Sequence, residues 1–198
     1  MIRWVIVLVL AAVAVFQAWP AETIRHAPGV LAPREPVQAA VADARPIAHK
    51  GFRIRPLAAF EVEARVLSVE RYWLWREATL SPIDVALGWG PMSDQQIVDR
   101  LEISQGNRYY HFRWHGSPPL PAQTLGAHSA NMHLIPASSA VWRTLKAVRP
   151  GPVVRRAGSL VSATTSDGWR WDSSLTRKDS GPGACELVWV ETATFTRR

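Results

Sequence analysis

An apolar run in the first twenty residues constrains this chain more than any other segment. It covers residues 4–16 without interruption, extends to Trp19 if one polar residue is allowed, and has Arg3 as the only charge before it. Its length lies between a secretory signal core and the roughly 17–25 residues of a spanning helix. No pair of small residues stands where a signal peptidase cuts, so residues 1–20 are predicted to be an uncleaved membrane anchor, with a signal peptide as the alternative.

The flanks of this run predict its orientation. Trp4 and Trp19 stand where interfacial aromatic residues sit, and the positive-inside rule places Arg3 in the cytoplasm. The expected protein is a single-pass membrane protein whose C-terminal domain is periplasmic or extracellular. The remaining alternative is that the apolar run forms a core helix of a soluble domain.

Residues 21–57 are rich in proline and alanine and are predicted to form an extended linker. Proline removes a backbone donor and fixes φ, so five prolines in this stretch disfavour helix and sheet. The linker and leader also carry much of the formal net charge of +7, because residues 1–58 hold seven Lys and Arg against three Asp and Glu. Residues 59–198 hold sixteen against thirteen, without a basic cluster, and this excludes a nucleic-acid partner.

Residues 58–198 are expected to form one globular domain. The chain has one cysteine, Cys185, which excludes an internal disulfide and the multi-cysteine zinc patterns. About 140 residues can bury enough apolar surface to fold without such staples.

Alternation and turn signals predict short strands with two helices between them. Strands are expected at residues 60–66, 109–114, 132–135 and 185–190, the second with an aromatic face of Tyr110, Phe112 and Trp114, and a strand hairpin is expected around a primed turn at Asp167-Gly168. One helix should cover residues 94–101, capped by Ser93 with Gln96, and another should follow Pro136, with Ser138 or Ser139 at its start. Segregated strands and helices predict an α+β fold, with a small twisted, mostly antiparallel sheet or partial barrel.

Two blocks, HSANMHLIPA at 128–137 and GWRWDSSLTRKDSGPGACELVWVE at 168–191, together with the Gly158-Ser159-Leu160-Val161 strand, resemble a family of uncharacterised bacterial proteins with an N-terminal anchor. The resemblance covers about residues 60–191, and the order W-x-S-S-L-x-R-x-D-x-G-x-G-A-C-E is its specific part. It implies no activity. The chain has Gly151-Pro152 where the family pattern implies Gly-Asp, so a side chain able to cap or coordinate is missing there.

The polar residues of these blocks are the candidate binding site. Segments 128–136 and 169–186 are expected to meet in space, because buried polar groups must find partners. Arg177 should pair with Asp179 or Glu186, and could instead contact an anion. No metal is expected, because His128 and His133 are five residues apart and would face opposite sides of a strand. The full candidate set is His128, Ser129, Asn131, His133, Ser173, Ser174, Arg177, Asp179 and Glu186.

The sequence favours a non-catalytic binding or assembly module without a cofactor, whose partners are the membrane and another envelope protein or a glycan. Two alternatives stay open. Cys185 with His128 as base could form a cell-envelope hydrolase, although a cysteine that opens an apolar strand is more often a core thiol. Trp169 and Trp171 share one face of a strand and could stack on sugar rings.

Overall fold

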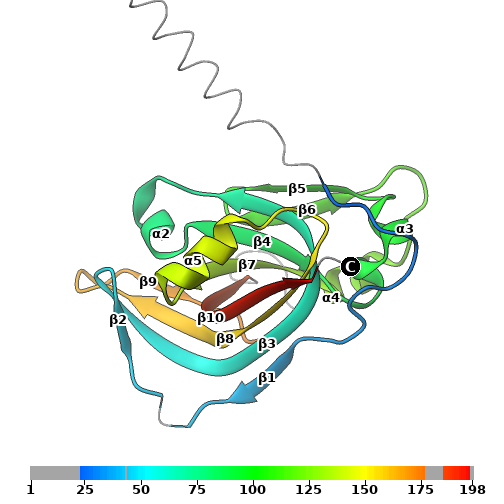
Figure 1. Ribbon diagram of the computed structural model, residues 1–198. Coiled ribbons are helices and arrows are strands. Elements are labelled where there is room, and N and C mark those ends of the chain that lie inside the picture. Colours follow the sequence, from blue (N-terminus) through cyan, green and yellow to red (C-terminus); the bar gives the residue numbers. More distant parts are fainter. Residues whose placement is uncertain (1–22, 43, 177–184, 197–198) are drawn as a thin grey trace, which may run out of the picture.

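The computed structural model describes residues 23–42, 44–176 and 185–196. Their fold is mostly β-sheet with short helices, which agrees with the predicted α+β class (Figure 1). The strands are β1 (Val37–Ala40), β2 (Ile47–His49), β3 (Phe52–Arg71), β4 (Ile83–Gly88), β5 (Glu102–Gly106), β6 (Tyr109–Arg113), β7 (Ser129–Pro136), β8 (Val153–Thr164), β9 (Arg170–Asp172) and β10 (Glu186–Thr196). The helices are α2 (Trp75–Leu80), the 3₁₀ turn η1 (Gly90–Ser93), α3 (Gln95–Val98), α4 (Ala122–Ala127) and α5 (Ser139–Lys146).

The main sheet curls so far that its pairings form a ring. One edge of the 20-residue strand β3 pairs in succession with β2, β1 and β4, and its other edge pairs with β8. From β4 the pairing continues to β7, then β10, and back to β8. All of these pairs are antiparallel except β7 with β10, so the sheet is mixed. Register shifts in β3 and β10 mark bulges, which increase local twist and help the sheet to curl.

Apolar side chains fill both faces of this curled sheet. The largest cluster lies inside the ring and combines alternate residues of β3, β4, β7, β8 and β10 with Val141 and Leu145 of α5. A second cluster forms on the other face of β7, β8 and β10, where Trp169 and Trp171 of the β9 segment pack against it. A third cluster lies under the separate β5–β6 hairpin and includes Tyr110 and Phe112, which confirms the expected aromatic face of that strand.

The two predicted helices are present, with one difference. Ser138 caps α5 by accepting a hydrogen bond from the backbone N–H of Val141 at 3.2 Å, as the sequence indicates. The first helix is shorter than predicted, and its cap is Asp94, whose carboxylate accepts from the N–H of Gln96. The Ser93 hydroxyl is not available for that cap because it accepts from the N–H groups of residues 31 and 32. Helices α2 and α4 were not predicted, since six residues give little periodicity.

The hairpin between β8 and β9 forms, but its turn is not a primed two-residue turn. Only Gly168 has a positive φ, of 89°, whereas a type I′ turn needs two such residues. The N–H of Gly168 donates to the carbonyl of Thr165, and the N–H of Thr165 donates to the carbonyl of Trp169. This is the pattern of a longer loop that ends in a glycine bulge.

The predicted linker is wrong for its described part. Strands β1 and β2 and the start of β3 lie within residues 21–57, and Ala32 is buried. Proline removes ladder donors, but two of the remaining N–H groups before β1 find side-chain acceptors: that of His26 donates to Gln95 and that of Gly29 to Asp94. The domain therefore begins near residue 24 and not at residue 58.

The predicted membrane anchor, residues 1–20, lies outside the described residues. Among the helices that the structure does describe, none has the length and apolar character needed to span a bilayer.

Candidate ligand-binding cavity

An open cavity of about 510 Å³ lies where β7, the end of α2, the β5–β6 turn and the β9 segment come together. Aromatic and charged groups share its wall, and its lining includes Glu77, Arg108, His133, Trp169, Trp171 and Cys185. Such a mixture of apolar surface with a few polar groups is typical of small-ligand sites.

The register of β7 with its neighbours β4 and β10 brings together the polar residues at and beneath the cavity. His133 in β7 stands opposite Asp84 in β4 and Leu187 in β10. Asn131, two residues earlier on the same face of β7, lies beside Cys185 at the start of β10, and its Nδ2 is 3.9 Å from the sulfur. Segments 128–136 and 169–186 do meet, as the sequence predicts, because β7 and β10 are parallel neighbours.

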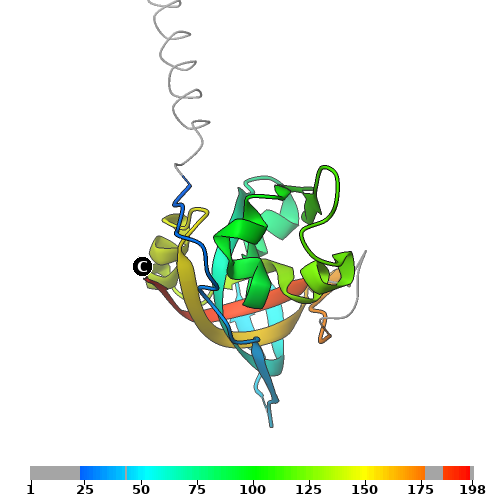
Figure 2. The same ribbon diagram turned by 90° about the vertical axis from the view of Figure 1, so that its right-hand side faces the viewer.

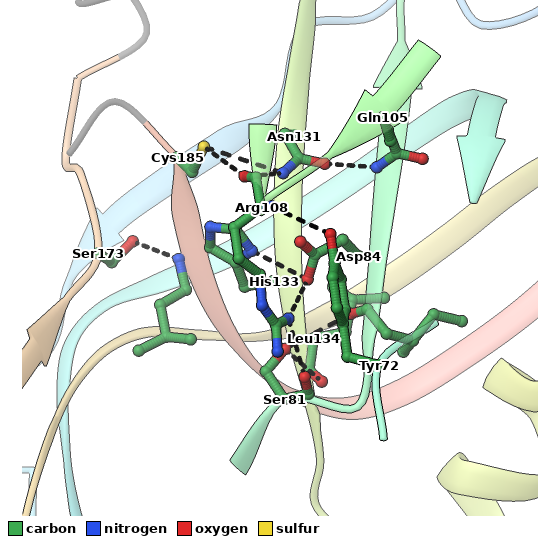
Figure 3. A network of polar contacts seen from close by, with 12 residues as sticks. Tyr72, Ser81, Asp84, Gln105, Arg108, Asn131, His133, Leu134, Ser173 and Cys185 are labelled. Carbon is green, nitrogen blue, oxygen red and sulfur yellow. Dashed lines mark hydrogen bonds and ion pairs between the residues drawn. The ribbon is translucent and has the colours of Figure 1, made fainter. Parts of the chain in front are cut away.

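A buried carboxylate, Asp84, lies beneath the cavity, behind the lining residues Arg108 and His133 (Figure 3). Its Oδ1 accepts a hydrogen bond from Nη1 of Arg108 at 2.7 Å and lies 2.9 Å from Nδ1 of His133. The contact with His133 is an ion-pair distance without good hydrogen-bond alignment, since Nδ1 makes no aligned hydrogen bond. An unpaired buried carboxylate would be costly, so Arg108 is the group that makes Asp84 tolerable there.

Arg108 reaches this position through a strained turn. Asn107 and Arg108 have φ values of 51° and 69° and form the two-residue loop between β5 and β6. Two positive φ values define the type I′ turn, and a long side chain rarely occupies its second position. Backbone strain of this kind persists only where surrounding contacts hold it, and it is common at binding sites.

Several contacts hold this turn in place. The N–H of Arg108 donates to the hydroxyl of Tyr72 at 3.1 Å, and its carbonyl accepts from Nδ2 of Asn131 at 2.9 Å. The guanidinium lies 3.6 Å from the centre of the Tyr72 ring, a close cation–π contact. Burial, with the nearby Asp84 carboxylate, raises the pKa of Tyr72 to about 12, so its hydroxyl stays protonated at neutral pH.

Two tryptophans form the apolar wall. The ring centres of Trp171 and His133 are 4.7 Å apart, and Trp169 packs edge-on against Trp171 at 6.2 Å between ring centres. Trp169 is supported from behind by Phe52, again edge-on, at 5.6 Å. Both indoles are only partly buried, so each packs on the second core cluster and still lines the cavity.

The predicted site residues divide between the cavity and other places. His133 lines it and Asn131 lies beside the lining residue Cys185, while His128 at the end of α4 and Ser129 at the start of β7 bond the carbonyls of Thr124 and Leu125. Nδ1 of His128 lies 2.8 Å from the carbonyl oxygen of Thr124, whereas the Cys185 sulfur lies near Nδ2 of Asn131 and the carbonyl of Arg108. The predicted Cys185–His128 pair therefore does not form in this arrangement, and Cys185 is half-buried beside the cavity and is not a core thiol.

The other predicted residues have structural surroundings. The Ser173 hydroxyl accepts from the N–H of Leu187 at 3.0 Å and so fixes the β9 segment to β10, and the Ser174 hydroxyl donates to the carbonyl of Thr176. Glu186 is registered with Met132, whose side chain is in the interior cluster, so it faces away from the cavity. Arg177 and Asp179 lie outside the described residues.

Sequence reasoning missed Asp84, Arg108 and Tyr72. A signal existed for the first, because a lone acid in the apolar run IDVALG needs a buried partner. Asn107 after a glycine was a turn signal that pointed to the β5–β6 hairpin. Nothing local indicated that the residue after Asn107 would reach that acid.

No group of three or more His, Cys, Asp or Glu side chains converges as a metal site within residues 23–42, 44–176 and 185–196. Comparison with known protein families, with curated proteins and with solved structures gives no match to this chain.

Proposed function

We propose that this chain is a membrane-tethered, extracytoplasmic binding module that holds a saccharide of the cell envelope in the cavity beside Trp171. The observation that supports this most is the presence of two indole rings and several charged side chains around one open cavity. The tether rests on the apolar run at residues 4–16, and membership of a bacterial anchored family rests on the sequence blocks described above.

A saccharide fits this combination better than an apolar ligand. The C–H face of a sugar ring packs on an indole, and its hydroxyls need planar polar partners around the rim. Here Glu77, Arg170 and Asp172 stand around the two tryptophans, with Arg170 Nε bonded to Asp172 at 2.6 Å. A purely apolar ligand would leave these groups poorly solvated, which costs affinity.

Binding is tested with two defined sugars, the N-acetylglucosamine–N-acetylmuramic acid disaccharide and neutral chitobiose. We expect saturable heat release in calorimetry with the acidic disaccharide, and a loss of at least about tenfold in affinity in Trp171→Ala, since loss of one stacking aromatic typically costs more than 1 kcal/mol. Trp73→Ala, which removes an exposed indole that does not line the cavity, is the matched control and should bind as the unaltered chain does.

Each remaining outcome has a definite reading. Equal affinity in Trp171→Ala and the unaltered chain would contradict the placement of the ligand. Absence of saturable binding with both sugars would contradict the ligand class. Preference for chitobiose would retain the site and show that the carboxylate of the acidic disaccharide adds no affinity.

A further inference from the structure

Three consecutive large apolar residues are exposed at the tip that connects β3 to α2. Trp73, Leu74 and Trp75 are 78, 72 and 83% exposed. The other exposed large apolar residues of the described chain occur singly, and single ones are ordinary on protein surfaces. A contiguous exposed group of this size is instead typical of an interaction surface.

The fold holds this tip in an unfavourable backbone conformation. Trp75 has a φ of 76°, a left-handed value that is a real outlier for a bulky residue and costs about 1–2 kcal/mol. The strain is maintained from both sides: the N–H of Tyr72 donates to the carbonyl of Pro82, and Ala78 and Leu80 of α2 are buried. The tip is therefore a fixed projection on a packed base, not an end that collapses onto the domain.

The tip lies at the same end of the domain as the start of the described chain. Arg71, two residues before it, donates to the carbonyls of Lys146 and Val148, and the N–H of Ile24 donates to the carbonyl of Pro150. Residues 146–150 thus contact both the strand end that leads to the tip and the start of the described chain. Figure 1 and Figure 2, which differ by 90°, both show α2 and the first described residues at the upper end of the domain and β1 at the lower end.

The side of the tip that faces α5 carries positive charge. Helix α5 has Arg143 and Lys146 exposed and no acidic residue, and Arg149 follows it. Arg76, directly after the tip, is paired with Asp167 at 2.7 Å, so the net positive charge comes from residues 143, 146 and 149. Exposed tryptophans flanked by cations match the interface of an anionic bilayer, where indoles lie among head groups and Lys and Arg meet lipid phosphates.

We propose that Trp73, Leu74 and Trp75 enter the head-group region of the bilayer and form a second membrane contact of the domain. The inference rests on the proposed tether only for bringing the domain to a membrane; depth of insertion is a separate property of the tip. Because Glu77 of the same helix lines the cavity, the contact would hold the cavity close to the membrane surface.

The test measures the depth of a nitroxide label in full-length chain reconstituted into vesicles of phosphatidylethanolamine and phosphatidylglycerol. Leu74→Cys in a Cys185→Ser background carries the label, and Val37→Cys, 63% exposed in β1 at the opposite end, is the matched control. We expect the label at residue 74 to become several-fold less accessible to a water-soluble nickel complex, and more accessible to oxygen, than the label at residue 37. Equal accessibility of the two labels to the nickel complex would overturn the proposal and leave the tip as a surface for a protein partner.

A second measurement leaves Cys185 unchanged. Brominated lipids should quench the fluorescence of the unaltered chain more than that of Trp73→Phe/Trp75→Phe, and equal fractional quenching would overturn the proposal. Vesicle flotation separates this result from the tether. A chain that fails to float contradicts the tether. A chain that floats, but whose label at residue 74 is as accessible to the nickel complex as the label at residue 37, contradicts only the membrane contact of the tip.

Discussion

At the scale of single residues, Arg156 is the least expected feature of the core. It points from β8 into the interior cluster beside Phe60, Val62 and Met132, and it is 3% exposed. None of its three guanidinium nitrogens has a hydrogen-bond partner among the described residues. Burial lowers the pKa of this side chain to about 9.

Replacing this buried charge should stabilise the protein. We expect Arg156→Met to increase the free energy of unfolding by about 1–4 kcal/mol, because a hydrophobic side chain of similar length removes the cost of desolvating the guanidinium. Thermal and denaturant unfolding measure the change. Arg155→Met, which alters an exposed ion pair with Glu63 on the other face of β8, should change stability by no more than about 0.5 kcal/mol. A marked loss of stability in Arg156→Met would show that the guanidinium has a favourable partner.

At the scale of secondary-structure elements, the β2–β3 hairpin contains a half-buried histidine that should make stability depend on pH. His49 in β2 lies edge-on against Trp189 of β10 at 5.0 Å. Burial, and to a lesser extent Lys50, lowers its pKa below the ordinary value of 6.5. As pH falls through 6.5, the unfolded chain binds a proton that the folded chain resists, so the free energy of unfolding decreases until the folded-state pKa is passed.

We expect His49→Phe to remove this contribution to the loss of stability at acidic pH. The phenyl ring keeps the edge-on contact with Trp189 and does not titrate, so the difference in stability between pH 7 and pH 5 should become smaller than in the unaltered chain. His115→Phe is the control, because His115 is exposed at 87% of its side chain. Denaturant melts at both pH values give the comparison, and identical pH dependence in His49→Phe and the unaltered chain would contradict the role of His49.

At the scale of the whole molecule, the stretch before β1 acts as a strap bound to η1 and the start of α3 and not as a loose tether. It is attached where Gly151 approaches Ile24: a Cβ at Gly151 would lie 2.2 Å from the Ile24 carbonyl oxygen, and its φ is 115°. Nε2 of His26 lies 2.9 Å from the Gly151 carbonyl, which continues the attachment.

Gly151→Ala should therefore detach the strap. We expect faster amide exchange at Leu31 and Ala32 and a larger loss of stability than in Gly29→Ala. Both glycines have positive φ, so alanine costs about 1–2 kcal/mol of backbone strain at each, but a Cβ at Gly29 would meet no atom within 4 Å. Exchange measured by NMR or mass spectrometry distinguishes the two variants. Equal effects would mean that strain alone, and not the contact with Ile24, decides the result.

Part of this architecture follows from local sequence. The period-two pattern at residues 60–66, the Ser138 cap and the aromatic alternation at residues 109–114 each predict an observed element, because such patterns reflect which face of a short segment is buried. Adjacency of segments 128–136 and 169–186 was also predictable, since both hold polar groups that require partners.

Tertiary structure alone decided the cavity and the strap. Asp84, Arg108 and His133 come from three strands or turns separated by more than twenty residues, and only the register of β4 with β7 and the strained turn after β5 bring them together. Local periodicity reports which side of a strand is buried; it does not report which distant charge will be there. For the same reason the prolines before residue 57 wrongly predicted a linker without sheet: its described part contains β1 and β2, and the surface that binds this stretch was set by Ser93, Asp94 and Gln95.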